Sequence, residues 1–202
     1  MSKSIAYVTA FLIGAAALPA WAQTAPADPN NAEATQRDVN QQNRIDQGLK
    51  DGQLSTGEAA HLENGEAHID QMESNADKNG SMSAAERARI NAAQNRESKA
   101  IVRDDNNNIK GNPNSASSKR MQADVQRDAN QQRRIENGER TGSLTPREAG
   151  KLERGQARDN RQQTHDGRKG YLTAQNQRHI QKAENHQSQR IDDKKHNGVV
   201  TQ

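Results

Sequence analysis

Residues 52–58 read Gly-Gln-Leu-Ser-Thr-Gly-Glu, and this pattern predicts the end of one helix and the start of the next. A Ser or Thr at the N-cap accepts a hydrogen bond from the N3 amide, and a Glu at N3 completes a reciprocal capping box. The Gly can end the preceding helix in a left-handed conformation. The same Gly-x-(Leu/Met)-(Ser/Thr)-x-x-Glu pattern recurs at 80–86 and 142–148, and at 170–176 with Asn176 in place of the Glu. The sequence therefore predicts four helix–turn–helix junctions.

The junctions belong to a duplication of the chain. Residues 36–45 (Gln-Arg-Asp-Val-Asn-Gln-Gln-Asn-Arg-Ile) return at 126–135 as Gln-Arg-Asp-Ala-Asn-Gln-Gln-Arg-Arg-Ile. This indicates two repeat units, at 36–108 and 126–198, joined by a polar linker at 109–125. Because apolar residues recur three and four apart, we expect an all-α fold of two tandem copies of a roughly three-helix unit. The predicted helices span about 33–50, 56–75, 84–104, 124–140, 146–164 and 174–196.

The composition limits both the core and the chemistry. Only 30% of the 202 residues are hydrophobic and 2% are aromatic, so we expect a marginal core. The chain has no cysteine, which excludes a disulfide scaffold, Cys-ligated zinc and a thiol nucleophile. The sequence contains no Ser–His–Asp pattern, nucleophile elbow or phosphate-binding loop. We therefore expect a protein that is not an enzyme.

Residues 1–22 have the organisation of a secretory signal peptide. A basic start precedes a short apolar run and an Ala20-x-Ala22 site, which predicts cleavage after Ala22. The apolar run is too short for a comfortable transmembrane span. The mature protein is then periplasmic or secreted and does not span the membrane. Residues 23–35 are expected to form a flexible N-terminal segment ahead of the first unit.

The second unit has the weaker predicted core. Ile69 of the first unit corresponds to Asp159 of the second, and Met72 likewise corresponds to Gln162. Each buried large aliphatic side chain contributes roughly 1.5–3 kcal/mol, so this loss is serious in a small core. We expect the second unit to be less stable than the first, or to depend on docking to the first unit or to a partner.

The two halves also differ in charge. Residues 23–112 hold 10 Lys+Arg against 15 Asp+Glu, whereas residues 113–202 hold 18 against 11. This asymmetry allows self-association through the acidic first unit and the basic second unit. It also allows the basic unit to bind an anionic envelope surface, such as lipopolysaccharide or phospholipid. A solvated basic face is the simpler alternative, and nucleic acid is not expected as a partner of an exported chain with so few aromatics.

Residues 75–86 resemble the twelve-residue calcium loop of EF-hand proteins. Oxygen-bearing side chains fall where such a loop ligates a hard cation, and Gly80 stands at the turn. The resemblance implies weak calcium binding, with Asn75 at the position where the family normally has Asp. The alternative is a helix–turn–helix corner, whose capping box accounts for Gly80, Ser83 and Glu86 without metal. The candidate ligands are Asn75, Asp77, Asn79, Ser81, Ser83 and Glu86.

Two histidine pairs are a second candidate for metal binding. His61 and His68 are seven residues apart on one predicted helix, as are His179 and His186 on another, so each pair shares a face. A transition-metal site would need a third ligand from another helix, and the sequence does not identify one. We expect these to be surface histidines.

Two resemblances bear on function. The Gly-x-Leu-Thr-x-x-Glu repeats, with an Ile-x-x-x-Lys-His-Asn ending at 191–197, are similar to those of bacterial secreted helical-repeat proteins of no known activity. More loosely, Leu-Thr-Ala-Gln at 172–175 resembles the Leu-Thr-x-x-Gln motif of the Spy/CpxP class of periplasmic chaperones, which implies a cradle for unfolded protein clients. We expect a non-enzymatic binding or stress-protective, chaperone-like helical repeat protein, with a weak calcium- or metal-binding protein as the alternative.

Overall fold

The computed structural model describes residues 29–198, and the regular structure of this part is entirely helical, which confirms the all-α prediction. The predicted signal peptide at 1–22 and its cleavage site lie outside the described residues. No helix within 29–198 combines the length and the apolar character that a membrane span requires. The elements are α1 (Pro29–Asp51), α2 (Thr56–Ala76), the 3-10 turn η1 (Asp77–Asn79), α3 (Ala84–Asp105), α4 (Ala116–Thr141), α5 (Pro146–Gly167) and α6 (Ala174–Lys195).

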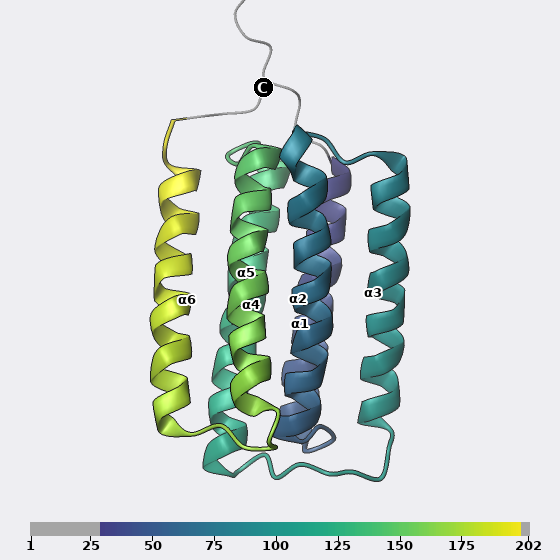
Figure 1. The fold of residues 1–202 in the computed structure, drawn as a ribbon, viewed down its shortest axis with the longest axis vertical. Helices are drawn as coiled ribbons and strands as arrows, with labels where there is room; N and C mark the ends of the chain where they lie inside the picture. Colours follow the sequence, from purple (N-terminus) through teal and green to yellow (C-terminus); the bar gives the residue numbers. More distant parts are fainter. Residues whose placement is uncertain (1–28, 199–202) are drawn as a thin grey trace, which may run out of the picture.

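The two repeats pack against each other through their first two helices. The most extensive contacts join α2 to α5 and α1 to α4, so these four helices form a central bundle (Figure 1). α3 packs on α1 and α2, and α6 packs on α4 and α5 at the opposite side of the bundle. Helices occupy corresponding sequence positions 90 residues apart, which pairs α1 with α4, α2 with α5, and α3 with α6. One apolar cluster joins the repeats through Met121 and Val125 of α4, whereas the other two clusters each lie within one repeat.

Capping boxes start three of the helices, as the repeated motif predicts. Ser55, Ser83 and Thr145 each accept a hydrogen bond from the backbone N–H of the Glu three residues later, and that Glu accepts one from the N-cap backbone. Thr173 caps α6 by accepting from the backbone N–H of Asn176. The glycines that open the four motifs have left-handed φ angles of 70° to 86°; they are Gly52, Gly80, Gly142 and Gly170.

An asparagine two residues after the end of α3, and another two residues after the end of α6, each donate a hydrogen bond to a capping glutamate. Asn107 Nδ2 donates to Glu58 Oε1 at 2.6 Å, and Asn197 Nδ2 donates to Glu148 Oε1 at 2.5 Å. The two endings, at 101–107 and 191–197, share only their Ile and their final Asn, and this asparagine has a structural role. It closes each repeat onto the start of that repeat's second helix.

The first helix begins earlier than predicted. α1 begins at Pro29, so the expected flexible segment at 23–35 is helical from residue 29 onward. Asn31 and Thr35 are buried, and Thr35 Oγ1 donates a hydrogen bond to Glu139 Oε2 of α4 at 2.8 Å. Polar contacts with the other repeat hold this first part of α1, and apolar periodicity gives no sign of them.

The predicted linker at 109–125 is partly wrong. α4 begins at Ala116, so the second half of this segment is helical. Ser115 is the N-cap and accepts a hydrogen bond from the N–H of Ser118 at 3.0 Å. Because Ser118 stands where the other motifs have Glu, the start of α4 lacks the capping-box pattern, and the Ser and Asn residues before it indicated a loop.

An apolar cluster of the first repeat is lost in the second. Its members are Ala34, Ile69, Ala76, Met82, Ile90 and Ala93, with the half-buried Met72 packed against them. In the second repeat the positions of Ala34, Ile69 and Ala76 carry Asp124, Asp159 and Asp166. The second repeat keeps an apolar cluster of Ile135, Leu144, Ala149, Leu152 and Ile191. It therefore has the thinner apolar core, as the sequence indicated.

Glycines on the central helices let the outer helices come close. A Cβ at Gly65 of α2 would lie 1.9 Å from Glu97 Oε2 of α3. At the equivalent Gly155 of α5, a Cβ would lie 2.0 Å from Gln187 Oε1 of α6. Glu97 of α3 and Gln187 of α6 therefore each pack directly against a glycine of a central helix, which adds a carboxyl and an amide group to the packing between helices.

This packing predicts that neither repeat is stable alone. Residues 23–112 and 113–202, expressed separately, should show less helical circular dichroism and a lower Tm than the intact chain, because the α2–α5 and α1–α4 contacts are lost. The second repeat, with the thinner apolar core, should be the less stable of the two. Equimolar mixing should restore helical signal. A separate repeat that melts at the Tm of the intact chain would contradict the packing.

Candidate metal centre

The interior of the bundle contains many acids and no bases. Sixteen Asp and Glu side chains of the described residues are buried, whereas none of the described Lys, Arg or His side chains is. Basic side chains pair with five of these acids: Asp46, Asp104, Glu136, Glu148 and Glu184. Among residues 31–198, no ion pair reaches the central acids, which are Asp38, Glu63, Glu66, Asp70, Glu73, Asp128, Glu139 and Glu153. A buried carboxylate without a base needs a proton or a cation, because its charged form is poorly solvated there.

Buried amides act as hydrogen-bond donors to these carboxyl groups. Gln94 Nε2 of α3 donates to Asp38 Oδ1 at 2.7 Å and to Glu73 Oε1 at 3.3 Å. Gln132 Nε2 of α4 donates to Asp70 Oδ1 of α2 at 2.8 Å, which links the two repeats. An amide donates a hydrogen bond without carrying charge, so these contacts leave the negative charge of an ionised carboxylate uncancelled.

The duplication exchanges carboxyl and amide side chains. At five buried or half-buried positions, one repeat carries an acid and the other carries the amide of the same length. The pairs are Glu66 and Gln156, Asp70 and Asn160, Glu73 and Gln163, Gln94 and Glu184, and Glu97 and Gln187. Four of these five acids belong to the first repeat, although the sixteen buried acids of the described residues are divided equally between the two halves of the chain.

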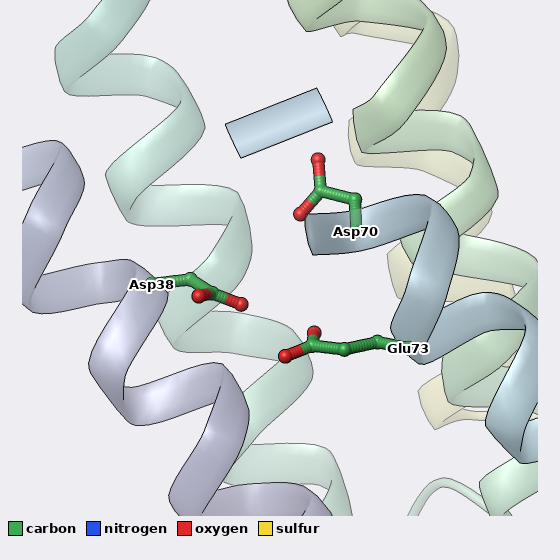
Figure 2. Close-up of side chains that lie close together, drawn as sticks. All are labelled: Asp38, Asp70 and Glu73. Atoms are coloured by element: carbon green, nitrogen blue, oxygen red, sulfur yellow. The ribbon is translucent and has the colours of Figure 1, made fainter. Parts of the chain in front are cut away.

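Three carboxylates of the first repeat converge. Asp38 projects from α1, and Asp70 and Glu73 project from α2, with the carboxylates of Asp38 and Glu73 pointing toward each other (Figure 2). One oxygen from each residue lies within 4.8 Å of the other two, and all three side chains are buried. No amide, hydroxyl or basic group of the described residues donates a hydrogen bond to Asp38 Oδ2 or Glu73 Oε2. Oxygens grouped in this way can ligate one metal ion.

A fourth carboxylate lies beside these three. Glu66 stands about one turn before Asp70 on α2, is 1% exposed, and has no hydrogen-bond partner at either oxygen. Burial, and next the negative charge of Asp38, raises the pKa of Glu66 well above its ordinary value. Glu66 thus adds negative charge beside the cluster, although its oxygens lie outside the group formed by Asp38, Asp70 and Glu73.

Burial raises the pKa of every carboxyl group in the cluster. It raises the pKa of Asp38 to about 7, although hydrogen bonds with Glu73 and Gln94 partly offset the effect. The pKa values of Asp70 and Glu73 rise well above the ordinary range, first because of burial and then because of neighbouring carboxylates. Near neutral pH the cluster therefore holds protons unless a cation neutralises it.

The donor atoms of the cluster suit a hard divalent cation. Carboxylate oxygens are preferred by Ca²⁺, Mg²⁺ and Mn²⁺, whereas zinc and copper sites usually include histidine or cysteine. The cluster contains only Asp and Glu. Gln94 Oε1 is also buried without a partner, and rotation of this amide would present an oxygen toward Asp38 and Glu73.

The EF-hand-like loop directs its two carboxylates to different partners. Asp77 lies in η1, is buried, and accepts a hydrogen bond from Asn31 Nδ2 of α1 at 2.6 Å. Glu86 Oε2 accepts from the Ser83 N–H at 2.9 Å and from Ser83 Oγ at 2.6 Å. The capping box therefore accounts for Ser83 and Glu86 without a metal ion.

Other members of the predicted loop lie at the surface. Asn75 and Glu86 line one surface pocket of about 200 Å³, and Arg89 places a positive charge beside them. Asn79 and Ser81 are exposed. The structure thus brings together Asn75 and Glu86 and turns Asp77 toward α1. Calcium binding by this loop stays a prediction.

The predicted histidine pairs are on the surface. All four side chains are exposed, and the carboxylate cluster contains none of them; they are His61, His68, His179 and His186. This agrees with the expectation that they are surface histidines.

Sequence reasoning missed the acidic centre because it treated polar helix positions as surface positions. A signal was present in α2, where acids follow one another at spacings of three and four residues, the spacing of a single helix face. These acids are Glu63, Glu66, Asp70 and Glu73 in α2, with Asp77 directly after it in η1. All five are buried, so the stripe marks the face of α2 that turns inward.

Comparison with known proteins does not assign this chain to a family. No family model, no curated protein and no solved structure matches the chain. The resemblances to secreted helical-repeat proteins and to Spy/CpxP-class chaperones therefore stay predictions.

The buried carboxyl groups predict a protein that becomes less stable as pH rises. Groups with a raised pKa hold protons in the folded state that the unfolded chain has released, so the free energy of unfolding falls as pH rises through the folded-state pKa values. The pKa is raised to about 6 for Asp159 and to about 9 for Glu184, and it is raised well above the ordinary value for Asp70 and Glu73. Between pH 5 and pH 9, the Tm of the metal-free protein should fall by roughly 10 °C or more. Calorimetry in chelator-containing buffer measures this, and a Tm that rises over the range would refute it.

Proposed function

We propose that this chain is a non-enzymatic binding protein whose bundle interior holds a divalent cation. The proposal is carried by the convergence of Asp38, Asp70 and Glu73 within 4.8 Å, in a region without a buried basic side chain. A cation there would take the place of protons on the raised-pKa carboxyl groups. Because it would bind the folded state preferentially, it would also stabilise the fold in proportion to its concentration.

The burial of the cluster supports binding over catalysis. Asp38, Asp70 and Glu73 are all buried beneath the surface of the bundle, so a substrate has no direct approach to a cation held between them. The amides of Gln94 and Gln132 donate hydrogen bonds to the cluster and carry no charge. A structural or storage role for the cation follows from this arrangement.

An envelope location is part of the proposal. It is supported by the signal-peptide organisation of residues 1–22, with predicted cleavage after Ala22. A periplasmic or secreted protein of this kind would meet divalent cations in the surrounding medium, and cation binding would stabilise it there.

A chaperone-like role has less support from the surface. Shielding unfolded clients requires exposed apolar area. Among the described residues, the exposed large hydrophobic side chains are Val102 in α3 and Ile109 and Tyr171 in loops. This small apolar area places cation binding ahead of client binding.

Titration of the full chain with Mn²⁺ at pH 7.5, after treatment with chelator, tests the proposal. Mn²⁺ should raise the Tm saturably, and its paramagnetic broadening should be strongest at the amides around Asp38, Asp70 and Glu73. Asp70→Asn and Glu73→Gln should each weaken binding by roughly tenfold or more, about 1.4 kcal/mol, because each removes an anionic ligand. Ca²⁺ and Mg²⁺, titrated in the same way, would rank the cations.

The duplication supplies the control. Asp70→Asn and Glu73→Gln introduce the residue types found at the equivalent positions 160 and 163, so the fold should tolerate them. Asp128→Asn is the matched control, because Asp128 is the buried equivalent of Asp38 and contacts the amide of Gln163. Its Mn²⁺ affinity should stay close to that of the unmodified chain. Equal weakening by Asp128→Asn, or broadening spread evenly over the chain, would refute a defined site.

A further inference from the structure

The exterior of the protein is more basic than its composition indicates. The chain has 29 Lys+Arg against 26 Asp+Glu, a formal net charge of +3. Sixteen of these acids are buried, whereas every Lys and Arg within residues 31–198 is at least partly exposed. Turning acids inward leaves a surplus of positive charge on the surface, which favours anionic ligands.

A surface pocket of about 310 Å³ gathers four basic side chains where the end of α2 meets the first half of α5. Lys78 comes from η1, at the end of α2. The other three lie three and four residues apart on α5 and so share one helix face. The residues that line the pocket are Ser74, Lys78, Arg147, Gly150, Lys151 and Arg154.

The side chains that line the pocket are unbalanced in charge, and the nearby Asp77 carboxylate lies behind Gly150 rather than in the lining. The lining has no Asp or Glu, and the ion pairs within residues 31–198 include none of its four bases. Lys78 Nζ donates to Asn75 Oδ1 at 2.6 Å, a neutral acceptor that leaves its charge in place. Because like charges repel, an anion between these side chains would lower their electrostatic energy.

The pocket also has an unused hydrogen-bonding group. Ser74 is 1% exposed, and its Oγ has no partner, although buried hydroxyls usually have one. A Cβ at Gly150 would lie 2.6 Å from Asp77 Cβ, so glycine is what allows η1 to approach α5. This close approach brings Lys78 into the same pocket as Arg147.

The equivalent region at the other end of the α2–α5 pair lacks this cluster. The residues that correspond to the lining, in the same order, are Thr164, Arg168, Gly57, Ala60, His61 and Asn64. Arg168 is the single residue among them that carries a permanent positive charge. The basic pocket is therefore specific to one end of the pair and does not follow from the duplication itself.

We propose that this pocket binds a phosphate group, as free phosphate or as part of a phosphorylated headgroup. Arginine binds phosphate through paired N–H donors, and Arg147 and Arg154 supply two such groups. Lys78 and Lys151 add positive charge, and the hydroxyl of Ser74 donates from the buried side. The site is separate from the carboxylate cluster of the core and does not depend on cation binding there.

Inorganic phosphate and pyrophosphate are the first probes. Titrated into the full chain at constant ionic strength, they should give saturable amide shifts at Ser74, Lys78 and Gly150, with pyrophosphate binding more tightly. The double variant Arg147→Gln, Lys151→Gln should weaken binding by roughly tenfold or more, since it removes two charges. Ser74→Ala leaves the charge unchanged and should weaken binding by roughly two- to tenfold.

The double variant Arg178→Gln, Lys182→Gln is the matched control. It removes the same residue types at the same spacing from the exposed surface of α6, outside the pocket, and should bind phosphate normally. Sedimentation with phosphatidylglycerol vesicles, compared with phosphatidylcholine vesicles, is the second arm. Vesicle binding that only the pocket variant loses would identify a lipid headgroup, and saturable phosphate binding without sedimentation would identify a soluble phosphate.

Two results would overturn the proposal. Equal weakening by both double variants would assign binding to the basic surface in general, and the absence of saturable binding in both arms would exclude the pocket. Helical circular dichroism establishes that each variant is folded. If the Arg147→Gln, Lys151→Gln variant does not fold, Ser74→Ala and the amide shifts of the unmodified chain provide the test. Normal phosphate binding by Ser74→Ala, together with amide shifts that lie outside the pocket, would also overturn the proposal.

Discussion

The fold depends on how its buried carboxyl groups are neutralised. Asp38, Asp70 and Glu73 lie in the interior of the bundle, where the described residues include no buried base. Burying an uncompensated charge costs more than a hydrogen bond to an amide returns, so amides such as Gln94 and Gln132 cannot stabilise the charged form alone. Protons or a cation must complete the neutralisation. Folding of this chain is therefore coupled to the binding of one or the other.

The same constraint shapes the two repeats and the surface. The first repeat keeps the apolar cluster around Ile69 and most of the acids that the second repeat replaces with amides. The second repeat has the thinner apolar core and more of the basic side chains. Because the acids of both repeats turn inward, those basic side chains dominate the exterior. A nearly balanced composition thus produces an acidic interior and a basic surface, each suited to a ligand of opposite charge.

Local signals in the sequence predicted the helices, but they did not predict which polar side chains pack in the interior. The boxes at Ser55, Ser83 and Thr145 depend on neighbouring residues, so the starts of α2, α3 and α5 could be read directly from the sequence. Asp38 and Asp70 come together only through the packing of α1 on α2, and hydropathy assigns both to the surface. The three-and-four spacing of acids in α2 could have revealed the inward stripe, but not whether protons, amides or a cation would neutralise it.

Carboxyl carbon chemical shifts, followed by NMR while the metal-free protein is titrated, test the coupling most directly. They measure the protonation of individual buried side chains in the folded state. We expect midpoints near 7 for Asp38 and near 8 for Glu63, with Asp70 and Glu73 titrating well above their ordinary range. Midpoints near 4 for these groups, in a protein that stays folded, would show that the carboxylates are charged and solvated, and that the fold needs neither protons nor a cation to neutralise them.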